Sequence, residues 1–264
     1  MKVFMVDVAK CSGCYNCQIA CKDEHCGNDW APYAAPQPNS GQFWCAVKQR
    51  EHGQVPKVRV EYWPVFGGQD PAIADYAPEV LMEREDGLQV IMPEKAKGRR
   101  DIAERFEGVY YNEKLDVPQA CTGCAHLVDE GKLPHCVDLC ATGALRFGDA
   151  EEFASEMEAA ETLTPPSKGA PRVFYLNRPH LFIAGDVWDP KDNEIIEGAK
   201  VMLTMPNGKT VETLTDDFGD FYFRGIDEGT YGLAIEARGF VPVERTAIDV
   251  TESVNLGGFP LERA

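Results

Sequence analysis

Two groups of four cysteines constrain this chain more than any other feature of its sequence. One group lies in the first tenth of the chain and the other lies in its middle; their members are Cys11, Cys14, Cys17 and Cys21, and Cys121, Cys124, Cys136 and Cys140. In a reducing compartment, thiols gathered at short spacing are metal ligands before they are disulfides. The sequence therefore predicts a fold organised around metal.

The spacing within each group indicates which metal centre to expect. The first group reads C-x2-C-x2-C-x3-C, and the second reads C-x2-C-x11-C-x3-C. The first pattern is typical of bacterial ferredoxins, in which three cysteines cap one 4Fe–4S cluster and the fourth ligates its neighbour. We expect crossed ligation in two clusters: one held by Cys11, Cys14, Cys17 and Cys140, and the other held by Cys21, Cys121, Cys124 and Cys136.

Structural zinc is the alternative for these cysteines. Two tetrahedral zinc sites also use eight thiolates, but the first group crowds three of them more closely than structural zinc loops do. Gly13 and Gly123 each precede the second cysteine of a C-x2-C pair, where the backbone has to approach the cluster sulfides closely. Both observations favour clusters over zinc.

Charge and hydropathy exclude several classes of partner. The formal net charge of −17 opposes binding to nucleic acid and to anionic membranes, which select basic surfaces. No apolar run is long enough to span a bilayer, so direct membrane insertion is not expected. The segment "MKVFMVDVAK" is too short and too soon charged for a secretory signal. We expect a cytoplasmic protein, unless a partner carries it across a membrane already folded.

The two cysteine groups are separated by a long insertion, residues 22–120. Within it, Pro56–Trp63 alternates like a strand, Glu79–Pro93 has a hairpin signal at Asp86-Gly87, and Pro93–Phe106 favours a helix. After the second group, Asp149–Leu163 predicts an acidic helix capped by Asp149, and Thr164–Arg172 has the composition of a linker.

The C-terminal region predicts a separate all-β unit. Short alternating runs are divided by turn signals such as Asn207-Gly208 and Arg238-Gly239, which indicates a sandwich of about seven strands. Its expected inward side chains are Val187, Val201, Leu203, Phe221, Phe223, Tyr231, Leu233 and Ile235. A calcium site could be formed by the acidic cluster Asp216, Asp217 and Asp220, but Asp is also common in tight turns. The pattern resembles the carboxypeptidase-regulatory-like, transthyretin-like domain.

Several stretches together resemble the iron–sulfur small subunits of the molybdopterin oxidoreductase (dimethyl sulfoxide reductase) family. They are "VDVAKCSGCYNC", "MEREDGLQVIMPEKAKGRR", "VYYNE" and "CTGCAHL…LPHCVDLCATGAL". The chain is most similar to the branch that acts on polyhydroxylated aromatic compounds, the pyrogallol–phloroglucinol transhydroxylase type. Members of the family carry further cysteines in the middle segment. Here Tyr62–Val80 has none, so we expect two clusters rather than three or four.

The resemblance implies the architecture and the partner. It implies an α+β ferredoxin-like domain, residues 1–178, with two 4Fe–4S clusters and the insertion 22–120, followed by a β-sandwich, residues 179–264. It also implies a large catalytic subunit that carries a molybdenum or tungsten bis-pterin cofactor, so the active site is expected in that partner and no catalytic residue is expected here.

We therefore expect an electron-transfer subunit. The alternatives are a structural subunit whose clusters only stabilise the fold, an electron-transfer subunit of another molybdopterin oxidoreductase, and a free ferredoxin-type carrier. The insertion and the sandwich argue against the free carrier.

Two cysteines fall outside the pattern, Cys26 and Cys45, and are expected to be free or buried thiols. Three histidines lie near cluster cysteines in sequence and are candidates for hydrogen bonds to sulfur or for simple solvated residues: His25, His126 and His135.

Overall fold

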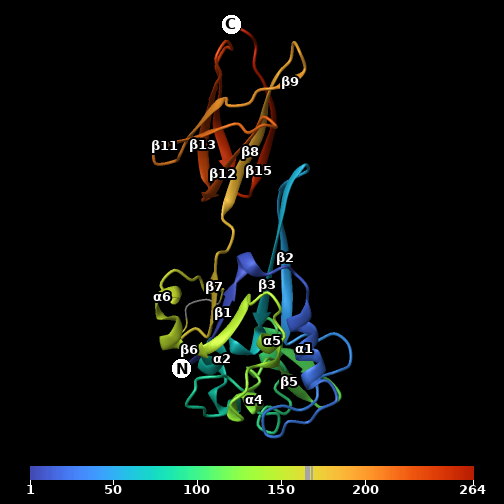
Figure 1. Cartoon of the computed structure of the whole chain (residues 1–264). Coiled ribbons are helices and arrows are strands. Elements are labelled where there is room, and N and C mark those ends of the chain that lie inside the picture. The colour runs from blue at the N-terminus through green and yellow to red at the C-terminus, as the bar shows by residue number, and fades with distance from the viewer. Residues whose placement is uncertain (164–166, 168) are drawn as a thin grey trace. The chain divides into compact units, whose positions relative to one another are not determined.

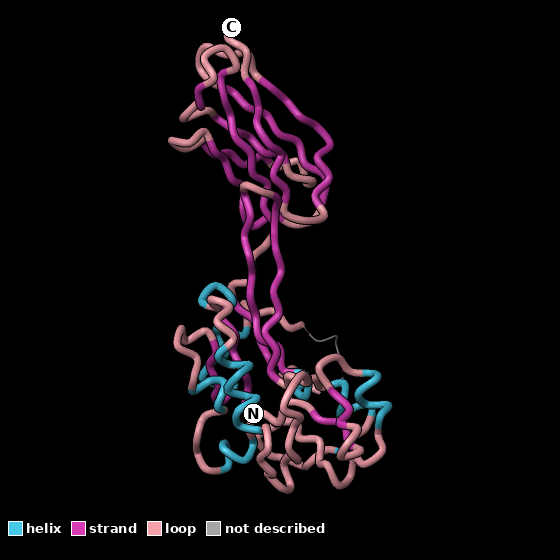
Figure 2. Tube along the Cα trace, turned by 90° about the vertical axis from the view of Figure 1, so that its right-hand side faces the viewer, coloured by secondary structure: helices cyan, strands magenta, loops and turns pink. Residues whose placement is uncertain are grey.

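The computed structural model of the chain describes residues 1–163, 167 and 169–264 (Figure 1). It divides into two compact units. Unit 1 comprises residues 1–49 and 61–178, and unit 2 comprises residues 50–60 and 179–264. The helices of the described chain all belong to unit 1, whereas unit 2 is built of strands and loops (Figure 2).

A three-stranded sheet forms the base of unit 1. Strand β1 (Lys2–Asp7) lies between β6 (Leu145–Asp149), to which it is antiparallel, and β7 (Val173–Leu176), to which it is parallel. Strand side chains alternate between the two faces of a sheet. Phe4 and Val6 accordingly pack into the core that holds the cysteines, while Val3 and Met5 pack against Phe153 on the other face.

Short helices and hairpins complete unit 1. Helix α1 (Asn16–His25) carries two of the cysteines, and helix α5 (His135–Asp138) carries a third. The remaining elements, including a hairpin whose tip belongs to unit 2, are η1 (Val8–Lys10), β2 (Cys45–Gln54), β3 (Lys57–Phe66), η2 (Gly67–Gln69), α2 (Ala72–Tyr76), η3 (Pro78–Val80), α3 (Arg100–Arg105), β4 (Tyr110–Asn112), β5 (Val117–Gln119), α4 (Ala125–Asp129), η4 (Ala150–Phe153) and α6 (Ala154–Met157).

The insertion follows the sequence prediction only in part. The strand predicted at 56–63 is confirmed as β3, which pairs with β2. The hairpin predicted at 79–93 is wrong as a pair of regular strands, because its arms meet in a single antiparallel bridge, Leu81 to Ile91. The helix predicted at 93–106 is confirmed only over α3, since Gly98 adopts a left-handed backbone (φ +74°) that ends any helix before it.

The acidic segment after the second cysteine group is shorter than predicted. A helix was expected over 149–163, but the regular turns end at Met157 in α6. The expected cap is confirmed: Asp149 and Glu152 form a reciprocal capping box at the start of η4. The predicted linker 164–172 falls partly outside the described residues, which omit 164–166 and 168.

Unit 2 is a β-sandwich of two sheets. One sheet has the order β11-β10-β13-β14, and the other has the order β12-β8-β15 with β9 paired to β8. The strands are β8 (Leu181–Asp189), β9 (Glu194–Ile195), β10 (Lys200–Thr204), β11 (Thr210–Leu214), β12 (Asp220–Ile226), β13 (Gly229–Glu236), β14 (Val243–Val250) and β15 (Val254–Pro260). All eight side chains predicted to face inward lie in its core, which confirms the alternation that the sequence indicated.

The acidic cluster in unit 2 is a turn. The Asp216 carboxylate accepts the backbone N–H groups of Phe218, at 3.0 Å, and of Asp220, at 2.9 Å. Asp220 also lies 2.5 Å from the Lys57 ammonium. These contacts are what a tight connection between strands requires, and they give Asp216 and Asp220 a structural role.

Unit 2 also contains a segment that the sequence prediction placed in the iron–sulfur domain. Residues 50–60 form the tip of the β2–β3 hairpin and group with the sandwich. In this tip the Lys57 side chain is only 5% exposed, and Gln54 accepts the backbone N–H of Asn255 at 2.8 Å. A Cβ atom on Gly53 would lie 2.5 Å from the Phe182 ring. Unit 2 therefore draws on two separate stretches of chain, although the sheets of the sandwich use only strands β8 to β15.

Candidate iron–sulfur site

The first cysteine loop is bent by left-handed residues. Gly13 (φ +68°) precedes Cys14, and Tyr15 (φ +62°) precedes the first residue of α1. A Cβ atom at Gly13 would lie 2.6 Å from the Tyr62 ring, so the loop has no room for a larger residue there. Such turns direct successive backbone N–H groups to one side of the loop, where they can bind an anionic group.

The second cysteine loop repeats this design. Gly123 (φ +64°) precedes Cys124 (φ +49°), and helix α4 begins immediately afterwards. The Gly123 N–H donates to the Cys121 sulfur at 3.3 Å. A Cβ atom on Gly123 would lie 2.8 Å from Leu88. The glycines singled out in the sequence thus stand where a side chain would collide with the wall of the site.

Helical spacing distributes the remaining cysteines. Cys17 and Cys21 lie four residues apart on α1, and Cys136 and Cys140 have the same spacing on and just after α5. Residues at i and i+4 share a helix face at different heights. Because α1 packs against α5, each of these pairs can place one cysteine in one site and one in its neighbour. This is the arrangement that crossed ligation needs.

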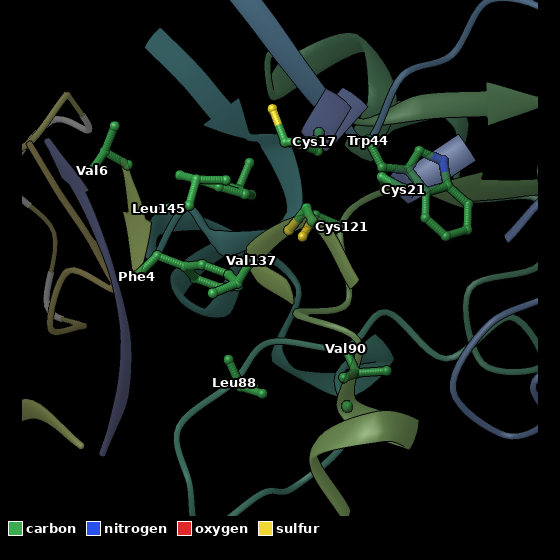
Figure 3. Close-up of a cluster of buried hydrophobic side chains, with 14 of the residues drawn as sticks. Phe4, Val6, Cys17, Cys21, Trp44, Leu88, Val90, Cys121, Val137 and Leu145 are labelled. Atoms are coloured by element: carbon green, nitrogen blue, oxygen red, sulfur yellow. The ribbon is translucent and has the colours of Figure 1, made fainter. Parts of the chain in front are cut away.

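The structure brings the eight cysteines together as two sets of four. Set 1 surrounds Cys11, whose thiol interacts electrostatically with those of Cys14, Cys17 and Cys140. Set 2 is connected in the same way: Cys21 interacts with Cys121 and Cys136, and Cys124 interacts with Cys136 and Cys21. Both sets combine cysteines from both halves of the motif. Figure 3 shows Cys17 of set 1 and Cys21 and Cys121 of set 2 among the apolar side chains of the core.

The two sets differ in burial. In set 1 Cys14 is exposed and Cys11 and Cys140 are half-buried, whereas every member of set 2 is buried. Burial is the main reason that the pKa of Cys21 lies well above its usual range, and the neighbouring Cys121 and Cys136 raise it further. A buried thiolate of this kind needs a cation, and iron supplies one when it displaces the proton.

The residues present are of the kind that a cubane cluster would need. Across 1–163, 167 and 169–264, no three Cys, His, Asp or Glu side chains converge closely enough to hold one metal ion. A zinc site would require such convergence, with each sulfur about 2.3 Å from the ion. A cubane has a different demand, because its four irons occupy separate corners and each takes one sulfur. Each set of four thiols has the number of sulfurs that one cubane takes.

A carboxylate that the sequence prediction missed organises the surroundings of set 2. Glu24 accepts hydrogen bonds from His126 Nε2 and His135 Nδ1, each at 2.8 Å. Burial opposes ionisation of Glu24, but these two hydrogen bonds outweigh it and hold the pKa of the carboxyl below its usual range. His126 follows Cys124 by two residues, and His135 precedes Cys136 directly. Glu24 thereby ties α1 to both ligand-bearing segments of the second half.

His25 contacts the site itself. Its side chain is 1% exposed, and its Nε2 atom lies 3.7 Å from the Cys124 sulfur. Burial, together with the nearby His126, lowers the pKa of His25 to about 3, so the ring is neutral. The His25 ring also packs against that of Trp44, with 4.8 Å between centroids. Of the roles that the sequence left open for this residue, contact with a cysteine sulfur is the one the structure shows.

The two cysteines outside the pattern occupy different environments. Cys26 is half-buried and its thiol donates to Asn39 Oδ1 at 3.3 Å. Cys45 is 1% exposed and lies beside Cys136 and Cys17, which together with burial raise the pKa of its thiol well above the usual range. Cys45 thus sits where set 1 and set 2 meet. Its position at the start of β2, far from either motif in sequence, gave no signal of this.

Two domain families match the chain. The 4Fe-4S dicluster domain matches residues 69–150, and the carboxypeptidase regulatory-like domain matches residues 183–257. The matches support a ferredoxin-type domain followed by a β-sandwich. None of the helices in the described part of the chain has the length and apolar character needed to cross a membrane.

Curated relatives extend the similarity over the whole chain. The chain is 33% identical to the pyrogallol hydroxytransferase small subunit of Pelobacter acidigallici, over 96% of both proteins. It is 25% identical to a subunit of tetrathionate reductase from Salmonella typhimurium, over 68% of this chain and 73% of that one. Identity to a subunit of the anaerobic dimethyl sulfoxide reductase from Escherichia coli is 28%, over 68% and 86% respectively. This chain belongs to the family of iron–sulfur small subunits of molybdopterin oxidoreductases.

Proposed function

We propose that this chain is an electron-transfer subunit that holds two 4Fe–4S clusters. Set 1 (Cys11, Cys14, Cys17 and Cys140) holds one cluster, and set 2 (Cys21, Cys121, Cys124 and Cys136) holds the other. The observation that carries the proposal is the meeting of eight cysteines from both motifs in two sets of four. A bound cluster supplies one-electron chemistry whose potential depends on hydrogen bonds and burial.

The chain's own residues have three tasks in this function. The thiolates bind iron, the bent loops direct N–H groups toward sulfur, and the apolar core excludes water from set 2. The backbone N–H of Leu145 donates to the Cys140 sulfur at 3.3 Å, as that of Gly123 does to Cys121. Such hydrogen bonds stabilise negative charge on sulfur and thus the reduced state. The exposure of Cys14 makes set 1 one point at which electrons can enter or leave.

The partner follows from the family. We infer a large catalytic subunit that carries a molybdenum or tungsten bis-pterin cofactor and performs the bond-making step. The similarity to the pyrogallol hydroxytransferase small subunit over nearly the full length of both chains supports polyhydroxylated aromatic compounds as substrates. A cytoplasmic location is the expectation for this complex. The motif cysteines are all assigned to clusters, which leaves catalysis to the partner.

A structural subunit is the second candidate. The relative is named a hydroxytransferase, and a hydroxyl transfer between two aromatic rings has no net redox change. In such an enzyme the clusters could stabilise the fold without carrying electrons. The exposure of set 1 favours electron transfer, because a purely structural centre gains nothing from an exposed Cys14.

Reduction in the intact complex separates the two candidates. The native complex is purified without oxygen, mixed with its aromatic substrate and frozen at intervals for electron paramagnetic resonance. Electron transfer predicts cluster signals that rise and decay within the turnover time. Clusters that stay in one oxidation state throughout turnover would leave only the structural role.

A further inference from the structure

A cavity of about 590 Å³ lies in unit 1, apart from the cysteine loops themselves. Its wall includes one face of the β2–β3 hairpin, to which Ala46 and Lys48 contribute from β2 and Trp63 and Val65 from β3. Trp44, directly before β2, continues the same alternation. The volume lies within the range of small-molecule sites. Binding of the two clusters leaves this space without a role.

The lining is aromatic with a cationic side. Lys48 and Arg172 are the cationic residues of the lining. Lys48 forms an ion pair with Glu107 at 2.7 Å, so its charge is already balanced. Arg172 donates to the backbone carbonyls of Gly87 and, at 3.3 Å, of Ala170. Among the described residues no carboxylate forms an ion pair with it, although Asp70 in the lining attracts it electrostatically. A planar ring with electron-rich oxygens fits such a lining. Six aromatic residues contribute to it: Phe43, Trp44, Trp63, Phe66, Tyr110 and Tyr175.

The cavity shares a wall with set 2. Helix η2 lines the cavity through Gly67 and Gln69, and its other side lies against the second cysteine loop. A Cβ atom on Gly68 would lie 2.2 Å from the Cys121 carbonyl oxygen. Gln69, which is 1% exposed, donates from its amide to that same oxygen at 2.9 Å. One turn of backbone therefore separates the cavity from a ligand of the buried cluster.

A second contact path reaches the same set from the start of β2. Trp44 contributes to the cavity wall, its ring packs against that of His25, and His25 lies 3.7 Å from the Cys124 sulfur. Gln69 thus connects the cavity to Cys121, and Trp44 connects it through His25 to Cys124, both cysteines of set 2. The exposed set 1 has no such connection among these contacts.

We propose that this cavity binds a small quinone or hydroquinone that exchanges electrons with the buried cluster. The proposal rests on the two-cluster function and adds the external redox partner. Two reduced clusters give one electron each, and two protons from water complete the conversion of both quinone carbonyls to hydroxyls. The reverse step oxidises a hydroquinone, releases two protons and reduces both clusters. A quinone oxygen accepts from Arg172, while the ring lies among the aromatic walls.

The test follows the oxidation of dithionite-reduced clusters in the intact complex by stopped-flow absorbance. The probe is 1,4-naphthoquinone-2-sulfonate, a planar and anionic quinone. A bound encounter predicts that the observed rate saturates with quinone concentration. Trp63→Ala and Arg172→Leu should each raise the half-saturating concentration about tenfold, from the loss of a ring contact or of a charged hydrogen bond. Ala46→Trp, which fills the cavity, should abolish saturation.

Two controls keep the outcome specific. Arg59→Leu removes the same charge from an exposed position on β3 outside the cavity and should leave saturation unchanged. Hexaammineruthenium(III), a compact cation that does not need the aromatic cavity, should oxidise all variants at one rate. The proposal would be overturned if the observed rate rises linearly with quinone concentration in the wild type. It would also be overturned if the half-saturating concentration is the same in the wild type and in all three cavity variants while the iron content is intact. Absence of iron in the wild type would instead contradict the two-cluster function.

Discussion

Cys17 and Cys21 show at the residue scale how one helix serves two sites. They lie four residues apart on α1, but Cys17 interacts with Cys11 in set 1, and Cys21 interacts with Cys121 in set 2. The sequence spacing predicted this division because the ferredoxin pattern is local. It did not predict the roles of Glu24 or Cys45, since contacts across more than a hundred residues, or between unmatched segments, leave no periodic signal.

Replacing Cys21 tests the crossed arrangement directly. Cys21→Ser should damage the cluster of Cys121, Cys124 and Cys136, because it removes one of four thiolates from a buried site. Iron should fall by about half, from eight to roughly four per chain, while the spectrum of the set 1 cluster persists. The readout is iron analysis together with electron paramagnetic resonance. Selective loss of the set 1 cluster would show sequential ligation.

Gly123 tests the geometry of the second loop. Gly123→Ala adds a Cβ atom 2.8 Å from Leu88 at φ +64°, so it should cost about 1–2 kcal/mol in backbone strain plus about 1–3 kcal/mol from overpacking. Gly131→Ala is the matched control, because φ is +73° there but the surrounding space is open. Set 2 should lose iron at lower urea concentration in the first variant than in the second. Equal midpoints would mean that the close contact with Leu88 is unimportant.

At the scale of elements, local signals were reliable in the sandwich and weaker in the insertion. The period-two pattern of β10, β12 and β13 identified buried side chains because each strand has one face in the core. In the insertion, a turn such as Asp86-Gly87 was visible, but its arms found only one bridge, Leu81 to Ile91. Those arms instead pack Leu88 and Val90 against the cysteine core, a tertiary demand that outweighs strand pairing.

The hairpin tip gives a prediction about element packing. Lys57 is 5% exposed and lies 2.5 Å from Asp220, which is 29% exposed. Asp220→Asn should leave a buried ammonium without its carboxylate and destabilise unit 2 by about 2–3 kcal/mol. Lys57→Met should cost less, because the remaining aspartate can reach solvent. Urea unfolding followed by hydrogen exchange in the sandwich strands provides the measurement.

An exposed pair supplies the matched control for this prediction. Glu212→Gln removes the acidic partner of Lys200, whose side chain is 43% exposed, and should change the unfolding midpoint little. A loss of stability as large as that of Asp220→Asn would remove burial as the explanation.

At the scale of the whole molecule, the division into two units bears on what can be removed. The cysteine sets lie entirely in unit 1, while unit 2 takes residues 50–60 from the hairpin. A chain that ends at Arg178, with residues 50–60 replaced by a short turn, should therefore retain both clusters and its large subunit. A chain that ends at Arg178 but keeps residues 50–60 should also retain iron, although Lys57 then lacks its ion-pair partner Asp220 and the hairpin tip is exposed. Co-expression with the partner and iron analysis measure both variants.

The outcome of those truncations also tests the role of the sandwich. Loss of both clusters from the variant that lacks the tip and the sandwich would show that unit 2 is required to fold the cluster domain. Retained clusters would leave docking or shielding as its task.

The metal content of the anaerobically purified complex distinguishes two clusters per chain from every other metal centre considered. Two sets of four cysteines predict about eight iron and eight labile sulfide per chain, and two interacting cluster signals after full reduction. Iron bound to the large subunit is subtracted by repeating the analysis on that subunit alone. A content of about twelve iron, of about four iron, or of zinc in place of iron would contradict the account.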